Sequence, residues 1–173
     1  NGCHAFDIIS FLFGPITWLH ATQLKSVQQL AVEDAASVRV CTASGVIGNV
    51  DLSWSWSTGR DTYLVARGTR GTVEIGWRQS QIKLNGTAWR KIGGPYNKLD
   101  AHRRMHAAFL DAISHGARPW ITSQDCLRVV AAVEAAYRSM QSGSWESIGA
   151  GGAGRVPPDW RRTGATVSAG VRA

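Results

Sequence analysis

The chain has 173 residues, of which 44% are hydrophobic, and this length and composition suit one globular domain. Its formal net charge is +7, but the positive residues are scattered and no groove-reading motif accompanies them, so we expect no nucleic-acid partner. No apolar run reaches the ~18 residues that a membrane-spanning helix requires, so we also expect no membrane partner.

A short buried helix is the first predicted element, because residues 5–13 are strongly apolar and end at Gly14-Pro15, a sharp stop signal. Strands follow it. Residues 38–57 alternate around turns, and within them Leu52, Trp54 and Trp56 fall on one face of a strand with serines on the other. Further strands are predicted over residues 62–67, 71–77, 81–84 and 89–92, with Asn85-Gly86 as a hairpin signal.

Two helices come next, over residues 99–115 and 122–141. The second begins at Thr122, with Asp125 in the acidic position of a capping box, and Gly143 marks its end. Helical spacing predicts that its apolar stripe faces the core. The members of that stripe are Cys126, Val129, Val130, Val133, Tyr137 and Met140. A last short strand is expected near residues 146–148.

This order of elements predicts an α+β fold, in which a mostly antiparallel, open-faced sheet carries helices packed on one face. Residues 1–148 form the predicted domain. The composition changes at residue 149, and the glycine-rich stretch 149–173 is expected to be a flexible, disordered tail. The uncovered face of the sheet must meet solvent, another domain or another subunit.

His4 and Asp7 are the candidate catalytic residues. They lie one helical turn apart on one side of the first helix, where a carboxylate could orient an imidazole for acid–base work. Taken alone, this spacing also fits an ordinary histidine–aspartate pair on a helix surface.

Three segments of the chain together resemble one enzyme family. The stretch GCHAFDIISFLFG is similar to the Gly-x-His-x-x-Asp helix of the glucose–fructose oxidoreductase and inositol dehydrogenase family (Gfo/Idh/MocA). Residues 63–75, YLVARGTRGTVEI, resemble its strand–Gly-Thr-x-Gly-Thr–strand segment, and residues 109–145 resemble its closing pair of helices. These segments follow the family's order and span residues 2 to about 148.

The resemblance implies roles for individual residues. His4 matches the family's acid–base histidine, and Asp7 matches the aspartate on the same helix, close to the substrate. Arg60, in a turn after the tryptophan strand, is a candidate substrate-binding residue, with an ordinary surface turn as the alternative. The family's glycine-rich cofactor loop, its Glu-Lys-Pro lysine and its second active-site aspartate have no counterpart here, and GAGGAG at residues 149–154 precedes prolines that would break a phosphate-binding helix.

The resemblance also implies a function for a longer parent protein. That parent would be an NAD- or NADP-dependent oxidoreductase that transfers hydride between the nicotinamide and a hydroxyl or carbonyl of a sugar, inositol or related polyol. Its cofactor would be held by an N-terminal Rossmann domain that is missing from this chain, so we expect the fragment alone to hold no cofactor and to be inactive. We further expect a homo-oligomer that forms through the open face of the sheet.

Two other hypotheses are weighed against this one. The same α+β sheet could be a non-catalytic dimerisation or interaction module. A nucleic-acid binder ranks last, because only the net charge and the basic tail support it. A metal site is not expected, because His102 and His106 lack a third ligand and have Arg103 and Arg104 beside them. The three cysteines are widely spaced, which is typical of reduced thiols in a cytoplasmic protein.

Overall fold

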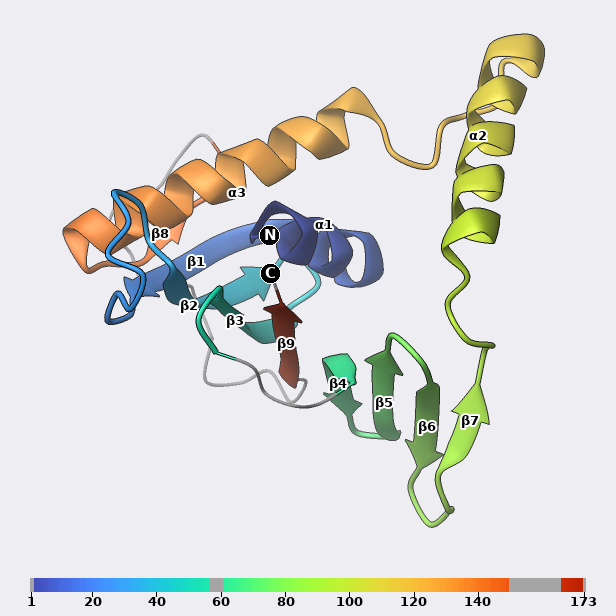
Figure 1. The fold of residues 1–173 in the computed structure, drawn as a ribbon, viewed down its shortest axis with the longest axis horizontal. Helices are drawn as coiled ribbons and strands as arrows, with labels where there is room; N and C mark the ends of the chain where they lie inside the picture. Colours follow the sequence, from blue (N-terminus) through green and yellow to red (C-terminus); the bar gives the residue numbers. More distant parts are fainter. Residues whose placement is uncertain (1, 57–60, 150–165, 173) are drawn as a thin grey trace.

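The computed structural model describes residues 2–56, 61–149 and 166–172. Within these ranges the chain forms three helices and nine strands (Figure 1). The elements are α1 (Gly2–Phe13), β1 (Ile16–Gln23), β2 (Ala35–Thr42), β3 (Ile47–Ser53), β4 (Thr62–Gly68), β5 (Gly71–Gly76), β6 (Ser80–Leu84), β7 (Arg90–Ile92), α2 (Lys98–His115), α3 (Ser123–Ser142), β8 (Glu146–Ser147) and β9 (Thr166–Arg172).

The strands form one sheet in the order β7-β6-β5-β4-β9-β3-β2-β1-β8. Every neighbouring pair is antiparallel except β3 and β9, which run parallel. This confirms the predicted α+β class and the mostly antiparallel sheet. The predicted helices and most strands occur within a few residues of their expected bounds.

Strand β9 departs from the expectation of a flexible tail. Its backbone lies between β3 and β4 and pairs with both, so it occupies edges that would otherwise present unpaired N–H and C=O groups. The tail expectation is therefore wrong for residues 166–172. Residues 150–165 lie outside the described part of the chain.

Two sequence expectations for the strands also need correction. Strand β1 was not predicted, because a register shift between Ile16 and Trp18 interrupts its alternation of buried and exposed residues. Strand β3 ends at Ser53, before the two tryptophans. The Ser53 hydroxyl accepts hydrogen bonds from the Ser55 and Trp56 amides, at 3.0 and 2.9 Å, and this turn ends the alternation and leaves Trp54 and Trp56 exposed.

Helices α1 and α3 cover one face of β1, β2 and β3 (Figure 1). Helix α1 starts close to the sheet at Gly2, where an added Cβ would lie 3.2 Å from Leu52 Cδ1. A larger residue at this position would therefore require a small shift of the Leu52 side chain or of the helix. The buried core consists of Ala5, Phe6, Ile9, Ile16, Leu19, Ala21, Val38, Val40, Val50, Ala132, Ala135 and Ala136.

Helix α3 packs through a narrower stripe than the sequence suggested. Its buried residues are Ala132, Ala135, Ala136 and Ser139, whereas the larger residues of the predicted stripe are half-buried or exposed. Small side chains let α3 approach β1 closely, so the larger ones flank the contact. The capping box of Thr122 and Asp125 and the left-handed Gly143 at the other end are confirmed.

Helix α2 is the exception among the helices. It stands apart from α1 and α3, coil joins it to β7 on one side and to α3 on the other, and none of its residues is buried (Figure 1). The prediction that helices pack on one face of the sheet therefore holds for α1 and α3 but not for α2. Among the described residues, no helix is both long and apolar enough to cross a bilayer.

Candidate functional site

The first turns of α1 carry both candidate catalytic residues. Ala5, Phe6 and Ile9 anchor this helix in the core, which places the neighbouring His4 at the surface and Asp7 in a half-buried position. No hydrogen bond joins His4 to Asp7 in the described structure. The sequence-predicted pair is thus on one helix but is not locked together, so each side chain is free to meet another group.

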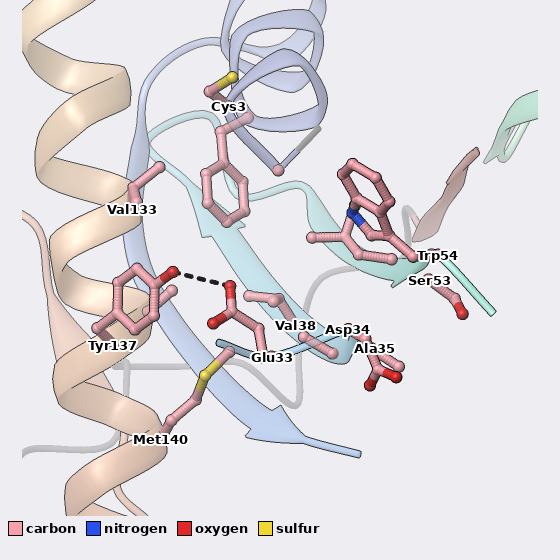
Figure 2. A pocket seen from close by; sticks show the side chains of 15 residues that line it. Cys3, Glu33, Asp34, Ala35, Val38, Ser53, Trp54, Val133, Tyr137 and Met140 are labelled. Atoms are coloured by element: carbon pink, nitrogen blue, oxygen red, sulfur yellow. Dashed lines mark hydrogen bonds between the residues drawn. The ribbon is translucent and has the colours of Figure 1, made fainter. Parts of the chain in front are cut away.

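A hollow of about 270 Å³ opens beside the start of α1, between this helix, α3 and the inner face of β2 and β3 (Figure 2). Its walls are mostly apolar, and its polar groups come from the loop before β2, the end of β3 and α3. The lining residues are Gly2, Cys3, Phe6, Glu33, Asp34, Ala35, Ala36, Val38, Leu52, Ser53, Trp54, Val133, Ala136, Tyr137 and Met140. A largely apolar pocket with a few convergent polar groups is the usual form of a small-molecule site. We call it the α1 hollow.

Tyr137 and Glu33 form the principal polar pair of the α1 hollow. The Tyr137 hydroxyl donates a 2.8 Å hydrogen bond to Glu33 Oε1, across the gap between α3 and the loop before β2 (Figure 2). This bond to Glu33, together with partial burial, raises the pKa of Tyr137. The phenol therefore keeps its proton at neutral pH and acts as a donor, while the second oxygen of Glu33 can still accept a hydrogen bond.

Asp34 holds the loop that forms one wall of the α1 hollow. It is 1% exposed, and its Oδ2 accepts hydrogen bonds of 2.7 Å from the amides of Val27 and Gln28 and one of 3.3 Å from the Ser55 hydroxyl. The Gln28 amide is the largest cause of the lowered pKa of this carboxyl, which stays ionised. Its backbone oxygen accepts from the Trp54 amide at 2.8 Å, so Asp34 also fixes the tryptophan at the rim.

Asp7 lies at a different hollow, between α1 and the segment that leads into α3. This space of about 250 Å³ is bordered by Asp7, Ser10, Phe11, Pro15, Arg118, Trp120, Ile121, Asp125 and Arg128. Arg128 forms a 3.1 Å ion pair with Asp125, whose pKa is lowered mainly by its hydrogen bond from the Thr122 side chain. His4 borders neither hollow, so the described residues do not bring His4 and Asp7 to one cavity.

The remaining candidates from the sequence are Arg60, His102 and His106. Arg60 lies outside the described residues. His102 and His106 are exposed on α2, and in the described ranges no group of three or more histidine, cysteine or acidic side chains could hold a metal ion. Sequence reasoning missed Glu33 and Asp34 as pocket residues. The only signal for Tyr137 was its place on the predicted stripe of α3, which gave no partner.

A nicotinamide dinucleotide does not fit the described part of this chain. Such a cofactor is held where a parallel strand leads through a glycine-rich turn into a helix. In the one parallel pair of the described sheet, β3 and β9, the next described element after β3 is the strand β4 and not a helix. The GAGGAG stretch lies almost wholly outside those residues. We therefore derive no chemical step through a cofactor bound to this chain.

Comparison with protein families gives the class of this domain. Residues 1–74, which contain α1 with His4 and Asp7 and most of β1 to β5, match the family model described as the GFO/IDH/MocA C-terminal domain. The resemblance predicted from the sequence is confirmed over residues 1–74, the part of the chain that this family model matches.

Curated relatives extend the match over most of the chain. A D-apiose dehydrogenase of Paraburkholderia graminis is 28% identical over 159 residues, which cover 82% of this chain and 42% of the relative. A D-apiose dehydrogenase of Rhizobium rhizogenes is 26% identical over 170 residues, 86% of this chain and 48% of the relative. The chain therefore spans less than half the length of the curated relatives that it matches.

A solved structure shows the same fold. An oxidoreductase from Agrobacterium radiobacter, in complex with NAD+, L-tartaric acid and magnesium, superposes with a TM-score of 0.73 at 22% identity. The match covers 86% of this chain and 48% of that protein. At this identity the likeness establishes the fold alone, and it extends the fold assignment beyond the 74 residues of the family match.

Proposed function

We propose that this chain is the substrate-side half of an NAD- or NADP-dependent dehydrogenase that acts on a CH–OH group of a sugar, an inositol or a related polyol. The observation that carries the proposal is the similarity to two D-apiose dehydrogenases over 82% and 86% of this chain. The Gly-x-His-x-x-Asp helix supports it, because His4 and Asp7 on α1 are side chains of the types that serve in acid–base catalysis. An aldose is therefore the first substrate class to test.

His4 is the proposed proton-transfer residue. It is exposed at the start of α1, so a substrate held by a second domain can reach its imidazole. Asp7, one turn further on, would position a neighbouring hydroxyl, and Arg60 would contact the substrate from its loop. The α1 hollow begins at Gly2 and Cys3, next to His4 in the chain, and would hold the part of the sugar away from the reacting carbon, with an aromatic surface at Trp54 and hydrogen-bonding groups at Glu33 and Tyr137.

The cofactor belongs to the other half of the proposed parent. The Agrobacterium radiobacter oxidoreductase is described with NAD+, which favours NAD as the first cofactor to try. On this proposal, the present chain alone has no dehydrogenase activity. It also assembles with a second copy through the outer face of the sheet, where Ser37 bonds Asp51 at 2.8 Å and Arg39 bonds Asn49 at 3.2 Å across β2 and β3.

The test begins with the full-length coding sequence. Its product is assayed for NAD and NADP reduction with D-apiose, other aldoses and inositols. We expect turnover in the full-length protein and none in this chain. Exchange of His4 for alanine should lower kcat by about 10²–10⁴-fold, the usual contribution of general acid–base catalysis.

His115→Ala is the matched control for this exchange. His115 lies at the end of α2 and bonds only Asp111, at 2.8 Å, so its loss should leave kcat unchanged. A full-length protein that reduces neither cofactor with any of these substrates would contradict the proposal. The interaction module would then be the better description, and the oligomeric state of this chain would be the next measurement.

A further inference from the structure

Helix α2 presents an apolar surface that nothing in the described structure covers. Met105, Phe109 and Ile113 follow one another at four-residue intervals, so they form a line along one side of the helix. Leu99 and Leu110 border this line. All five side chains are more than half exposed, and Ile113 reaches 66%. We call these five residues the α2 apolar face.

The opposite side of the same helix is polar. Asp100 and Arg103 form an ion pair of 3.5 Å there, and the small, exposed Ala107 lies between such charged positions. A helix with one apolar side and one charged side usually packs its apolar side against another part of a protein. Contiguous apolar patches beyond roughly a few hundred Å² are uncommon on monomeric domains and mark contact surfaces.

The α2 apolar face is continuous with a groove. Residues 119–121 run back along the helix, and with α2 they enclose a space of about 440 Å³ whose walls include Met105, Phe109, Trp120 and Ile121. Trp120 is 75% exposed. The surface is therefore hollowed and lined by large side chains, which suits a protein surface with protruding apolar residues.

Two observations decide which protein surface fits. The matched dehydrogenases and solved oxidoreductase are more than twice as long as the matched part of this chain, so each has a further half beside the same fold. A second copy of α2 fits less well. His106 lies at the midpoint of α2. If two copies of α2 paired antiparallel about a two-fold axis, the imidazoles of both copies of His106 would therefore meet at that axis, within the apolar contact.

We propose that the α2 apolar face is the docking surface for the nucleotide-binding half of the parent protein, an inference that rests on the proposed function. Coil joins α2 at both ends, at residues 93–97 and 116–122, and this allows the helix to leave the sheet and lie along a neighbouring domain (Figure 1). The contact would couple the substrate-side and nucleotide-side halves at a place remote from the start of α1.

Thiol labelling of single-cysteine substitutions on α2 tests this docking. Ile113→Cys places a thiol on the α2 apolar face, and Ala107→Cys places one on the polar side as the matched control. Each is made in this chain and in the full-length parent, and the labelling rate is read by mass spectrometry of the α2 peptide. We expect Ile113→Cys to react at least about tenfold more slowly in the full-length protein than in this chain, and Ala107→Cys to react equally fast in both.

Three results would overturn the docking proposal. Equal rates for Ile113→Cys in both proteins would show that α2 stays uncovered. Slow labelling in this chain alone that speeds up on dilution would assign the face to a second copy. A full-length gene without a further half would remove the partner. The cofactor-reduction assay distinguishes failure of this proposal from failure of the proposed function. If α2 is protected but the full-length protein is inactive, the docking proposal stands and the dehydrogenase proposal fails. If α2 is unprotected but the enzyme is active, the dehydrogenase proposal stands and the docking proposal fails.

Discussion

Helices α2 and α3 have similar amphipathic patterns but opposite fates in the structure. Helix α3 buries Ala132, Ala135 and Ser139 against β1, whereas α2 buries no residue at all. Both helices have a side-chain cap at the N-terminus and a left-handed glycine at the C-terminus. The difference shows that local signals decide whether a helix forms, whereas a second apolar surface decides whether the helix becomes part of a core.

The largest expected contrast concerns the two leucines Leu19 and Leu110. Leu19 is 0% exposed in the core under α1 and α3, so Leu19→Ala should lower the free energy of unfolding by about 2–5 kcal/mol. Leu110 on α2 is exposed, and Leu110→Ala should change it by less than about 0.5 kcal/mol in this chain. Urea unfolding followed by tryptophan fluorescence measures both. Equal losses would mean that α2 belongs to the core.

A smaller loss of stability is expected when the hydrogen bond between α3 and β1 is removed. The buried Ser139 hydroxyl accepts from the Ala21 amide at 2.9 Å and donates to the Ser144 carbonyl at 2.6 Å. Ser139→Ala leaves the Ala21 amide without a partner and should cost about 1–3 kcal/mol of the free energy of unfolding. Ser142→Ala, at an exposed position on the same helix, is the control. A loss no larger than that of the control would show that water replaces the Ser139 hydroxyl.

The helix caps sharpen the comparison further. Thr122→Ala removes the cap of α3 and should lower the free energy of unfolding by about 1 kcal/mol. Asn97→Ala removes the equivalent cap of α2, where Asn97 Oδ1 accepts from the Asp100 amide at 3.1 Å. Because no residue of α2 is buried in the described structure, we expect faster amide hydrogen exchange in α2 and an unchanged urea midpoint. A shifted midpoint for Asn97→Ala would show that α2 unfolds together with the body.

The smallest expected effect concerns Asp34, whose buried carboxylate makes the free energy of unfolding depend on pH in the acid range. Its pKa is lowered in the folded chain, so the stability it contributes is complete above the ordinary aspartate value and is lost as the pH falls through the folded one. Asp34→Asn should therefore flatten the fall in unfolding free energy between about pH 5 and pH 2. Asp100→Asn, which removes an exposed carboxylate from α2, is the control. An unaltered slope for Asp34→Asn would contradict the assigned hydrogen bonds.

Local patterns in the sequence predicted much of the fold. The apolar run before Gly14-Pro15 predicted α1, and the capping box of Thr122 with Asp125 predicted the start of α3, because both signals act within a few residues. Strand β1 was missed because its bulge breaks the alternation, and β9 was missed because its pairing with β3 joins residues far apart in the chain.

The site was predicted less completely than the fold. His4 and Asp7 could be proposed because a motif on one helix carries them, but their separation into different surroundings depends on which faces of α1 the sheet and α3 cover. The bond between Tyr137 and Glu33 joins residues 104 positions apart, and no local pattern reports it. The role of Asp34 can be recognised only in the structure, where the loop before β2 surrounds its carboxylate and donates two amide hydrogen bonds to it.

By itself, the sequence determined most of the helices and strands of this protein, its α+β class, its family resemblance and the chemical types of its candidate residues, since these follow from periodicity, capping and short motifs. Only the tertiary structure decided that alanines rather than larger residues carry the contact of α3, that Glu33, Asp34 and Trp54 share one hollow with Tyr137, and that α2 remains uncovered. The physical reason is that burial depends on which surfaces meet, and the residues that meet are distant in the chain.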